Sequence, residues 1–160
     1  MSATDERYTP IWLLNLVREQ CGGFDLDPCS CAQANETVQA KEFWTKEQDG
    51  LSRPWSGIVW CNPPYSRGNI DRWAAKFREE SLSGRVREAY FLVNAETSSK
   101  WFQALAAEFG FCLISKRLKF DTPEGLMPSA SPKPSVLFHS RRRVLQRSKL
   151  SPLYSLGVWT

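Results

Sequence analysis

The feature that most constrains the fold is the apolar run Gly57-Ile58-Val59-Trp60-Cys61, which leads directly into Asn62-Pro63-Pro64-Tyr65. A run of this kind, without charged side chains, predicts a strand buried on both faces, as in a parallel sheet that helices cover. Two consecutive prolines cannot donate to a strand ladder, so the strand has to end before them. The sequence therefore predicts an inner strand with a rigid polar-aromatic peptide at its carboxyl end.

Strands and helices are predicted to alternate along the rest of the chain, which is the pattern of an α/β fold with a mostly parallel sheet. Apolar runs predict further strands at 24–27, 38–44, 88–94, 111–115 and 135–138, and a proline-rich surface loop at 122–134. Apolar residues at helical spacing predict helices over 11–21, 70–81 and 98–108. We expect Thr9 to cap the first of these helices and Asn69 to cap the second.

Length and composition favour a compact single domain over residues 1–160, since 42% of the residues are hydrophobic and 24% are charged. No apolar stretch reaches the roughly eighteen residues that a membrane span needs. The first seven residues, Met1–Arg7, include two acids and no apolar segment, so we expect no secretory signal. These observations favour an enzyme or a binding module in the cytoplasm.

The five cysteines do not follow the spacing of a metal site. The closest pair, Cys29 and Cys31, is separated by a single residue, and His139 is the only histidine. Paired C-x-x-C motifs, which zinc sites commonly use, do not occur. We expect free thiols and no bound metal, and the alternative of a zinc-stabilised structural protein ranks last.

The Asn-Pro-Pro-Tyr peptide is suited to chemistry on a planar amino group. In an α/β sheet, ligands bind beyond the carboxyl ends of strands, which here are the segments after Asp27 and Cys61. The Asn62 side-chain oxygen and the Pro63 carbonyl can accept both N–H bonds of an exocyclic amino group and so localise its lone pair for attack. Tyr65 offers a face on which a planar base can stack, and the prolines stiffen the backbone. The alternative is that Asn62-Pro63-Pro64-Tyr65 is a simple turn with no part in chemistry.

The peptide Asn62-Pro63-Pro64-Tyr65 resembles the catalytic motif of amino-group methyltransferases that use S-adenosylmethionine. Further segments are similar to the small phage and prophage DNA N6-adenine methyltransferases, which are Dam-like. These segments are Tyr8-Thr9-Pro10, Phe24-Asp25-Leu26-Asp27-Pro28-Cys29-Ser30, Asp49-Gly50-Leu51, Trp55-Ser56-Gly57 and Val59-Trp60-Cys61-Asn62-Pro63-Pro64-Tyr65-Ser66. The ordered set spans about two-thirds of the chain and is more specific than any one segment.

The resemblance implies a Rossmann-like fold and a catalytic role for Asn62, Pro63, Pro64 and Tyr65. In that role Asn62 and Pro63 hold the target amino group, and Tyr65 stacks on an adenine flipped out of the duplex. It also implies action in the cytoplasm of a bacterial or phage-infected cell.

The cofactor would be S-adenosylmethionine, and the resemblance suggests Tyr8, Thr9, Pro10, Asp25, Asp27, Pro28 and Asp49 as its binding residues. Tyr8 to Pro10 match the segment that touches the methionine end. Asp25 and Asp27 are two residues apart, so strand alternation puts both on one face, and either carboxylate could meet the ammonium group. Asp49 matches an acid that binds the cofactor adenine, or else it belongs to a turn with Gly50. The loop after Asp27 lacks the glycines that this superfamily usually has there.

Net basicity and the resemblance together favour double-stranded DNA as the partner. Residues 81–160 contain 12 basic and 5 acidic side chains, whereas residues 1–80 contain 9 basic and 12 acidic ones. We expect the segment at about 141–150, with Arg141, Arg142 and Arg143, to contact phosphates, unless it is only a solvated tail. Ser66 and Arg67, which follow the catalytic motif, are further candidates for DNA contacts.

Two kinds of alternative remain at this point. Enzymes that methylate cytosine N4 or a glutamine amide share the same tetrapeptide, so it does not identify the substrate. A non-catalytic DNA-binding module would also be basic and rich in aromatic residues, but would have no need of Asn62 at the end of a strand. Binding of S-adenosylmethionine separates the enzyme from such a module.

Overall fold

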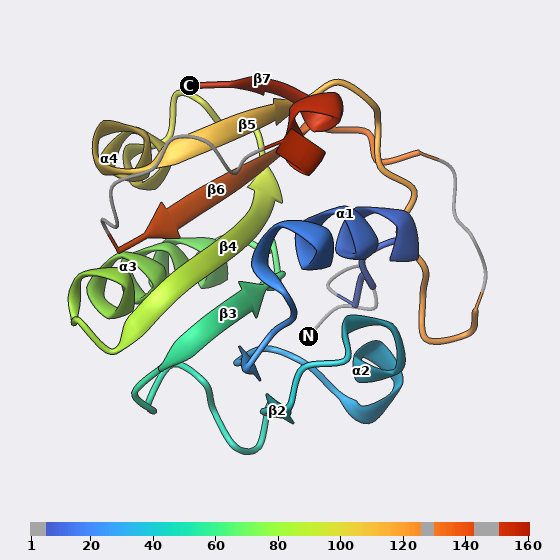
Figure 1. Ribbon diagram of the computed structural model, residues 1–160, viewed down its shortest axis with the longest axis vertical. Coiled ribbons are helices and arrows are strands. Elements are labelled where there is room, and N and C mark those ends of the chain that lie inside the picture. The colour runs from blue at the N-terminus through green and yellow to red at the C-terminus, as the bar shows by residue number, and fades with distance from the viewer. Residues whose placement is uncertain (1–5, 126–129, 143–150) are drawn as a thin grey trace.

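The computed structural model describes residues 6–125, 130–142 and 151–160, and within them seven strands form one sheet in the order β2-β1-β3-β4-β6-β5-β7 (Figure 1). The strands are β1 (Leu26–Asp27), β2 (Glu42–Phe43), β3 (Gly57–Cys61), β4 (Val86–Asn94), β5 (Gly110–Ile114), β6 (Ser135–Arg141) and β7 (Gly157–Trp159). The helices are α1 (Ile11–Cys21), α2 (Ala32–Val38), α3 (Asn69–Leu82), α4 (Lys100–Glu108) and a short 3-10 helix η2 (Ser151–Leu156).

Strand direction gives the sheet two distinct ends. Strands β2, β1, β3 and β4 pair in parallel, whereas β6 is antiparallel to both of its neighbours, β4 and β5. Strand β5 therefore points the same way as β4, and β7 points the opposite way. We call the end where β1, β3, β4 and β5 finish the carboxyl end of the sheet, and the opposite end, where β6 finishes, the amino end. The expected mostly parallel α/β sheet is confirmed.

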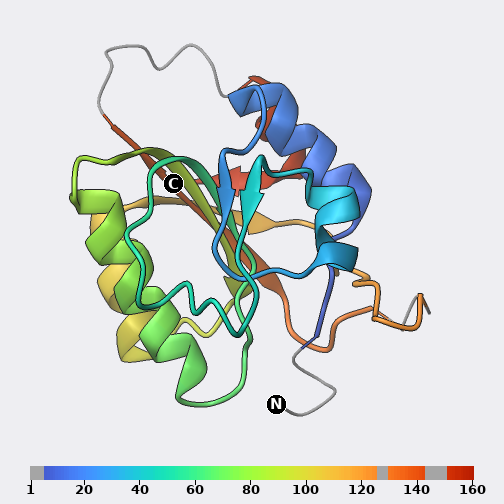
Figure 2. The ribbon, with the colours of Figure 1, turned by 90° about the horizontal axis from the view of Figure 1, so that it is seen from below.

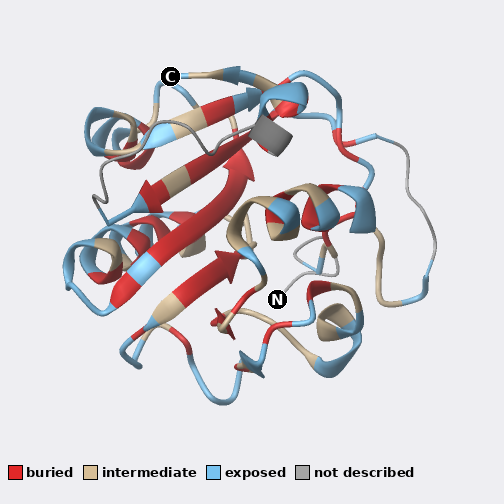
Figure 3. Ribbon diagram, in the orientation of Figure 1, coloured by how far each residue is buried: buried red, intermediate tan, exposed pale blue. Residues whose placement is uncertain are grey.

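Helices cover both faces of this sheet. Figure 2 shows α3 and α4 on one face and α1 and α2 on the other. Most residues of β3 and β4 are buried, as the mainly red colour of these strands in Figure 3 shows, and they are divided between two core clusters. One core cluster includes Phe77 of α3 and Phe102 of α4, and the other includes Leu14 of α1. The prediction that Gly57–Cys61 is a doubly covered inner strand is confirmed.

Two predicted helix caps are wrong, although the helices themselves form. Helix α1 begins at Ile11 with Pro10 as its N-cap and without a capping side chain, because the Thr9 hydroxyl bonds to Asn62 instead. Helix α3 is capped by Gly68, and the Asn69 amide donates to the Ser66 hydroxyl. In both places the side chain that was predicted to cap the helix bonds instead to a residue elsewhere in the fold or in the preceding loop.

The strand predicted over 38–44 is also wrong for most of its length. Residues 32–38 form α2, where Cys31 Sγ accepts a hydrogen bond from the backbone N–H of Ala34 at 3.4 Å. The helix ends at Gln39 in the left-handed conformation, and only Glu42–Phe43 join the sheet. Strand β7 was not predicted, because three residues give too short a pattern to recognise.

Neither a membrane span nor a metal cluster is found in these residues. None of the helices in the described ranges combines the length and the apolarity that crossing a bilayer requires. No group of three His, Cys, Asp or Glu side chains in those ranges is placed to hold a metal ion. The five cysteines are free thiols.

Candidate active site

A cavity of about 560 Å³ opens at the carboxyl end of β1 and β3, which is a size typical of ligand sites. The predicted site residues that line it are Tyr8, Thr9, Asp27, Pro28, Asp49, Asn62 and Pro64. Pro10, Asp25, Pro63 and Tyr65 are not among the lining residues. The fold thus gathers into one cavity residues that lie more than fifty positions apart in the sequence.

The Asn62 carboxamide is held in one orientation by the segment before α1. Its Nδ2 donates to the Arg7 carbonyl oxygen at 2.8 Å and lies 3.1 Å from the Thr9 hydroxyl oxygen. A carbonyl oxygen can only accept, so the NH₂ group has to face Arg7 and Thr9. The Oδ1 atom therefore points the other way, toward Tyr65.

Tyr65 lies between this amide and a second cavity. Its hydroxyl is 2.6 Å from Asn62 Oδ1 and 3.0 Å from the Leu92 carbonyl oxygen. Burial raises the pKa of the phenol, so the hydroxyl stays protonated and donates. The ring lies edge-on to Phe120, with centroids 6.4 Å apart, and borders a second cavity of about 330 Å³ that Trp101 also lines.

Asp27 ends β1 as a buried carboxylate that faces the first cavity. Its side chain is 2% exposed and accepts a hydrogen bond from the Cys29 backbone N–H at 3.1 Å. Burial raises the pKa of Asp27 to about 8, against smaller opposing effects of hydrogen bonds from Cys29 and Ser30. Because no ion pair to this carboxyl group occurs within the described residues, a cationic ligand could supply the missing positive partner and favour its ionised form.

Asp25 does not share this environment, although the sequence placed both acids on one face. It precedes the two-residue strand β1, so alternation does not extend to it. Its carboxylate lies toward the amino end of the sheet, where it bonds to Lys41 Nζ and the Ile58 backbone N–H, each at 2.8 Å. The bond from Lys41 lowers the pKa of Asp25. The geometry thus separates a structural acid, Asp25, from a cavity acid, Asp27.

Asp49 lies at the cavity on a loop that approaches β1 closely. Its backbone is left-handed, with φ of 52°, and its Oδ1 accepts from the Leu51 backbone N–H at 3.2 Å. A Cβ at Gly50 would lie 2.0 Å from the Pro28 carbonyl oxygen, so glycine is required at this contact. The turn interpretation of Asp49-Gly50 and the cavity-lining interpretation are therefore compatible.

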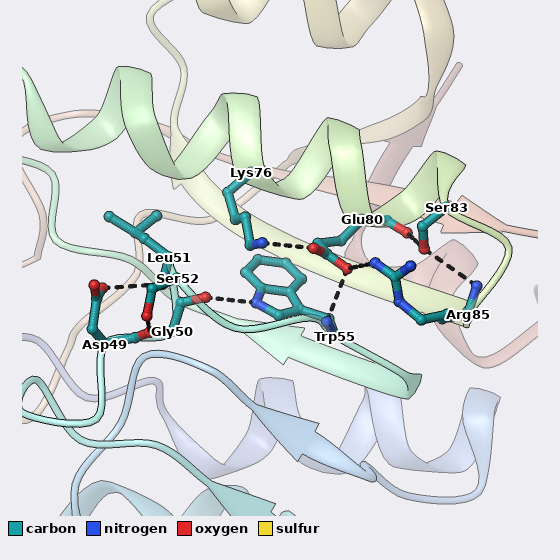
Figure 4. Close-up of polar contacts among 9 residues, drawn as sticks. All are labelled: Asp49, Gly50, Leu51, Ser52, Trp55, Lys76, Glu80, Ser83 and Arg85. Atoms are coloured by element: carbon teal, nitrogen blue, oxygen red, sulfur yellow. Dashed lines mark hydrogen bonds and ion pairs between the residues drawn. The ribbon is translucent and has the colours of Figure 1, made fainter.

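The same loop is anchored to α3 by a buried acid that the sequence analysis missed (Figure 4). The Trp55 indole N–H donates to the Gly50 carbonyl at 2.9 Å, and the Trp55 backbone N–H donates to Glu80 at 2.8 Å. Glu80 is 2% exposed and also accepts from Lys76 at 2.6 Å and from Arg85 at 2.7 Å. Helical spacing is the signal that could have found it, because Glu80 lies three residues after Phe77 and seven after Trp73 on the apolar stripe of α3, whereas the exposed Glu79 does not.

The residues proposed for DNA contacts fall at opposite ends of the sheet. Ser66 and Arg67 follow β3 at the carboxyl end, where the exposed Arg67 borders the second cavity. Arg141 and Arg142 lie at the amino end, where Arg142 donates to the Gly84 carbonyl at 3.1 Å. Arg143 and the remainder of the predicted segment to residue 150 lie outside the described residues.

Replacing Glu80 with Gln is expected to destabilise the protein by about 2 kcal/mol, because Lys76 and Arg85 lose a buried ionised partner. Burial by itself raises the pKa of Glu80, but the bonds from Lys76, Trp55 and Arg85 bring it below its usual range. This contribution is present at neutral pH and is lost as the pH falls through the lowered pKa.

Urea unfolding at pH 7 measures the effect, and Glu79→Gln, at the exposed neighbouring position, is the matched control. Equal stability of the two variants would contradict the anchoring role of Glu80.

Comparisons with known proteins agree with this geometry. The profile of the family Dam, DNA N-6-adenine-methyltransferase, matches residues 1–154. No match was found among curated protein sequences. Among solved structures, the chain is similar to PH1948 from Pyrococcus horikoshii, described as an RNA methyltransferase, with a TM-score of 0.54, 12% identity and 90% of each chain covered. For the 23S rRNA methyltransferase ErmE, the TM-score is 0.49 and the identity is 10%, over 92% of this chain and 76% of ErmE.

The similarity to PH1948 confirms the Rossmann-like α/β fold. The family profile covers nearly the whole chain, including the cavity residues, the Asn-Pro-Pro-Tyr peptide and the loop that Glu80 anchors. The chain therefore belongs to the Dam family of DNA N-6-adenine-methyltransferases, enzymes that methylate the N6 amino group of adenine in DNA.

Proposed function

We propose that this enzyme binds S-adenosylmethionine in the cavity beside β1 and β3 and methylates an adenine flipped out of double-stranded DNA. The observation that carries the proposal is the fixed Asn62 carboxamide, whose Oδ1 faces Tyr65 at the end of β3. A flipped base is required because adenine N6 is paired inside the duplex. Such a substrate is consistent with action in the cytoplasm of a bacterial or phage-infected cell.

The residues around the cavity fit the cofactor that this family and fold generally use. S-adenosylmethionine carries an ammonium and a sulfonium, and when bound it supplies an electrophilic methyl group. Asp27 would hold the ammonium, since its buried carboxylate has no ion pair in the part of the chain that the structure describes. Tyr8, Pro28 and Asp49 would form the surrounding walls. Pro10 and Asp25, which do not line the cavity, would act only indirectly.

Asn62 would act on the target nitrogen. An exocyclic amino group of adenine is a weak nucleophile because its lone pair is delocalised into the ring. When Asn62 Oδ1 and the Pro63 carbonyl accept its two N–H bonds, the lone pair is localised and directed at the methyl group. The Asn62 acceptor is fixed before the substrate arrives, which is the condition for electrostatic preorganisation. The proton can leave after transfer, so no general base is required.

Tyr65 would provide the surface on which the adenine stacks, and Pro64 would stiffen the backbone that leads to Tyr65. Its hydroxyl now donates to Asn62 Oδ1 or to the Leu92 carbonyl, because a single proton serves both oxygens. An amide oxygen has two lone pairs, so Asn62 can accept from the base while it still contacts Tyr65. The Tyr65 ring already makes a T-shaped contact with Phe120, so a stacking base would have to use ring surface outside that contact.

Thr9 would position Asn62 rather than bind the cofactor directly. The resemblance assigns Thr9 to the methionine end of the cofactor, but its hydroxyl oxygen is 3.1 Å from Asn62 Nδ2. Thr9 is 3% exposed, so water competes weakly for this bond. By accepting from Nδ2, Thr9 would keep Oδ1 directed toward the substrate.

The reaction is tested by incubating the enzyme and S-adenosylmethionine with DNA that lacks methylated adenine and by digesting the product to nucleosides. We expect N6-methyladenine. Asn62→Ala should slow single-turnover transfer by about 100- to 1,000-fold and leave cofactor affinity within a few fold. Asn15→Ala, on the exposed face of α1, is the control. N4-methylcytosine as the product, or an Asn62→Ala rate close to wild type, would refute the assignment.

Asp27→Asn should weaken cofactor binding while it stabilises the protein without ligand. A carboxyl group whose pKa is raised to about 8 keeps its proton in the folded state where the unfolded chain has lost it. Folded-state stability therefore falls as the pH rises toward 8, and the substitution removes that loss. Each kcal/mol gained should raise the melting temperature at pH 8 by about 2–4 °C.

Loss of one charge-assisted hydrogen bond should weaken S-adenosylmethionine binding by about 10- to 100-fold, measured by calorimetry. The exposed Asp71→Asn serves as the control at a carboxylate outside the first cavity. Unchanged affinity in the folded Asp27→Asn variant would exclude Asp27 as the ammonium ligand.

Thr9→Val should slow methyl transfer at saturating cofactor by about 5- to 50-fold, because Asn62 Nδ2 loses one acceptor. Cofactor affinity should change little, and Thr9→Ser, which restores the hydroxyl, should restore the rate. Single-turnover kinetics and calorimetry separate the two effects. Weaker cofactor binding with an unchanged saturated rate would instead place the Thr9 hydroxyl on the cofactor.

A further inference from the structure

The structure points to a DNA-phosphate surface at the carboxyl end of the sheet, made by Arg67 and by the exposed cations Lys116, Arg117 and Lys119. We propose that these side chains, and not Arg141 and Arg142, contact the backbone of the duplex next to the flipped base. This inference rests on the proposed function, because it assumes that the duplex delivers its base to Asn62. Beyond the proposed function, the inference gives the location and the composition of the surface that contacts DNA.

Strand direction brings these cations to the catalytic motif. Strand β5 points the same way as β3 and β4, so the segment 115–120 that follows it leaves the sheet at the end where Asn62 lies. Arg67 lies between β3 and α3, at the same end. In Figure 1 the orange segment after β5 lies beyond the arrowheads of β3 and β4, whereas the β6 arrowhead is on the opposite side.

The segment 116–120 is a fixed platform with an exposed basic side. Leu118 and Phe120 are buried, whereas Lys116, Arg117 and Lys119 are exposed. The Leu118 carbonyl accepts from the Ser131 backbone N–H at 2.7 Å, and Arg117 Nη1 donates to the Pro132 carbonyl at 2.6 Å. Anchoring of this kind presents the cations with little loss of backbone freedom on binding.

This platform touches the catalytic tyrosine directly. The Phe120 ring is edge-on to Tyr65 at 6.4 Å, and the Arg7 guanidinium lies 5.9 Å from the centroid of each ring. Cations on the next residues along the chain are therefore placed beside the ring on which the base would stack. Phosphates that flank a flipped nucleotide necessarily lie close to the entrance through which it passes.

The local charge balance favours a polyanion. Within the described ranges, none of the four cations Arg67, Lys116, Arg117 and Lys119 forms an ion pair with an acidic side chain. The nearby Lys133 is paired with Glu96 at 3.1 Å, so it is a weaker candidate. Acidic side chains do occur close by, at Asp71, Asp121 and Glu124, and they would limit contacts on their side of the surface.

Arg141 and Arg142 are badly placed for the same task. Arg141 pairs with Glu88 near the start of β4, whereas Asn94 at the end of β4 pairs with Ser135. Six residue steps along β4 separate the two positions, a distance of about 20 Å at 3.3–3.4 Å per residue. These two arginines therefore lie at the end of the sheet opposite to Asn62.

Two triple variants that each remove three positive charges test the inference. In one, Lys116, Arg117 and Lys119 are replaced by Ala, and in the other Arg141, Arg142 and Arg143 are replaced by Ala. Binding of a duplex of fixed sequence is titrated at several salt concentrations with the full chain. The first variant should lower affinity roughly 10- to 500-fold at about 0.1 M salt and reduce the log–log salt slope by about 0.9 for each phosphate that is no longer neutralised. The second should match the wild type.

Melting temperature, which should fall only slightly where Arg117 loses its bond to the Pro132 carbonyl, and S-adenosylmethionine affinity, which should equal the wild-type value, show that each variant is folded. A flattened slope only in the Arg141–Arg143 variant would overturn the inference, and so would unchanged slopes in both variants of an enzyme that methylates DNA. If the wild type binds the cofactor but neither binds nor methylates DNA, the proposed function fails as well. That outcome is distinct, because it appears before any substitution is made.

Discussion

The site depends on the hydrogen bonds that fix the Asn62 carboxamide. Its two partners, the Arg7 carbonyl and the Thr9 hydroxyl, come from a segment more than fifty residues earlier. That segment is itself held by Tyr8, whose backbone N–H and C=O pair with Asp121 at 2.9 and 3.0 Å. The acceptor face of Asn62 therefore exists only when the amino-terminal segment and the segment after β5 are both in place. Partial opening at either place would disorder the Asn62 carboxamide while most of the sheet stays intact.

Two buried acids show how the structure distinguishes support from ligand binding. Glu80 receives Lys76, Arg85 and a backbone N–H, so its charge is compensated and its pKa is lowered. Asp27 receives hydrogen bonds but no cation in the described residues, and burial raises its pKa. Burial of a carboxyl group without a cationic partner disfavours its ionised form, and a bound cation would favour that form again. The first acid holds the Asp49 loop against α3, and the second faces the cavity.

The sequence was sufficient where packing and covalent geometry determine the outcome. The β3 strand follows from an apolar run closed by Pro63 and Pro64, and its carboxyl-end position put Asn62 beside Asp27. Side chains with several possible partners could not be assigned. Thr9 bonds to Asn62 rather than capping α1, and the choice depends on which polar groups the fold brings close. Which groups the fold brings close also decides that Asp25 and Asp27 have different partners and that Glu80 anchors the Asp49 loop.

Charge counting showed that the second half of the chain is basic, but topology decides where that charge lies. Because β6 runs antiparallel between β4 and β5, the basic residues after β5 and those at the end of β6 emerge at opposite ends of the sheet. Under the proposed function, the carboxyl end receives two ligands of opposite sign, a cationic cofactor and a polyanion. Depth keeps them apart: Asp27 is 2% exposed inside the cavity, whereas Lys116 and Lys119 lie on the surface. Solvent screening between these layers lets one end of the sheet attract both.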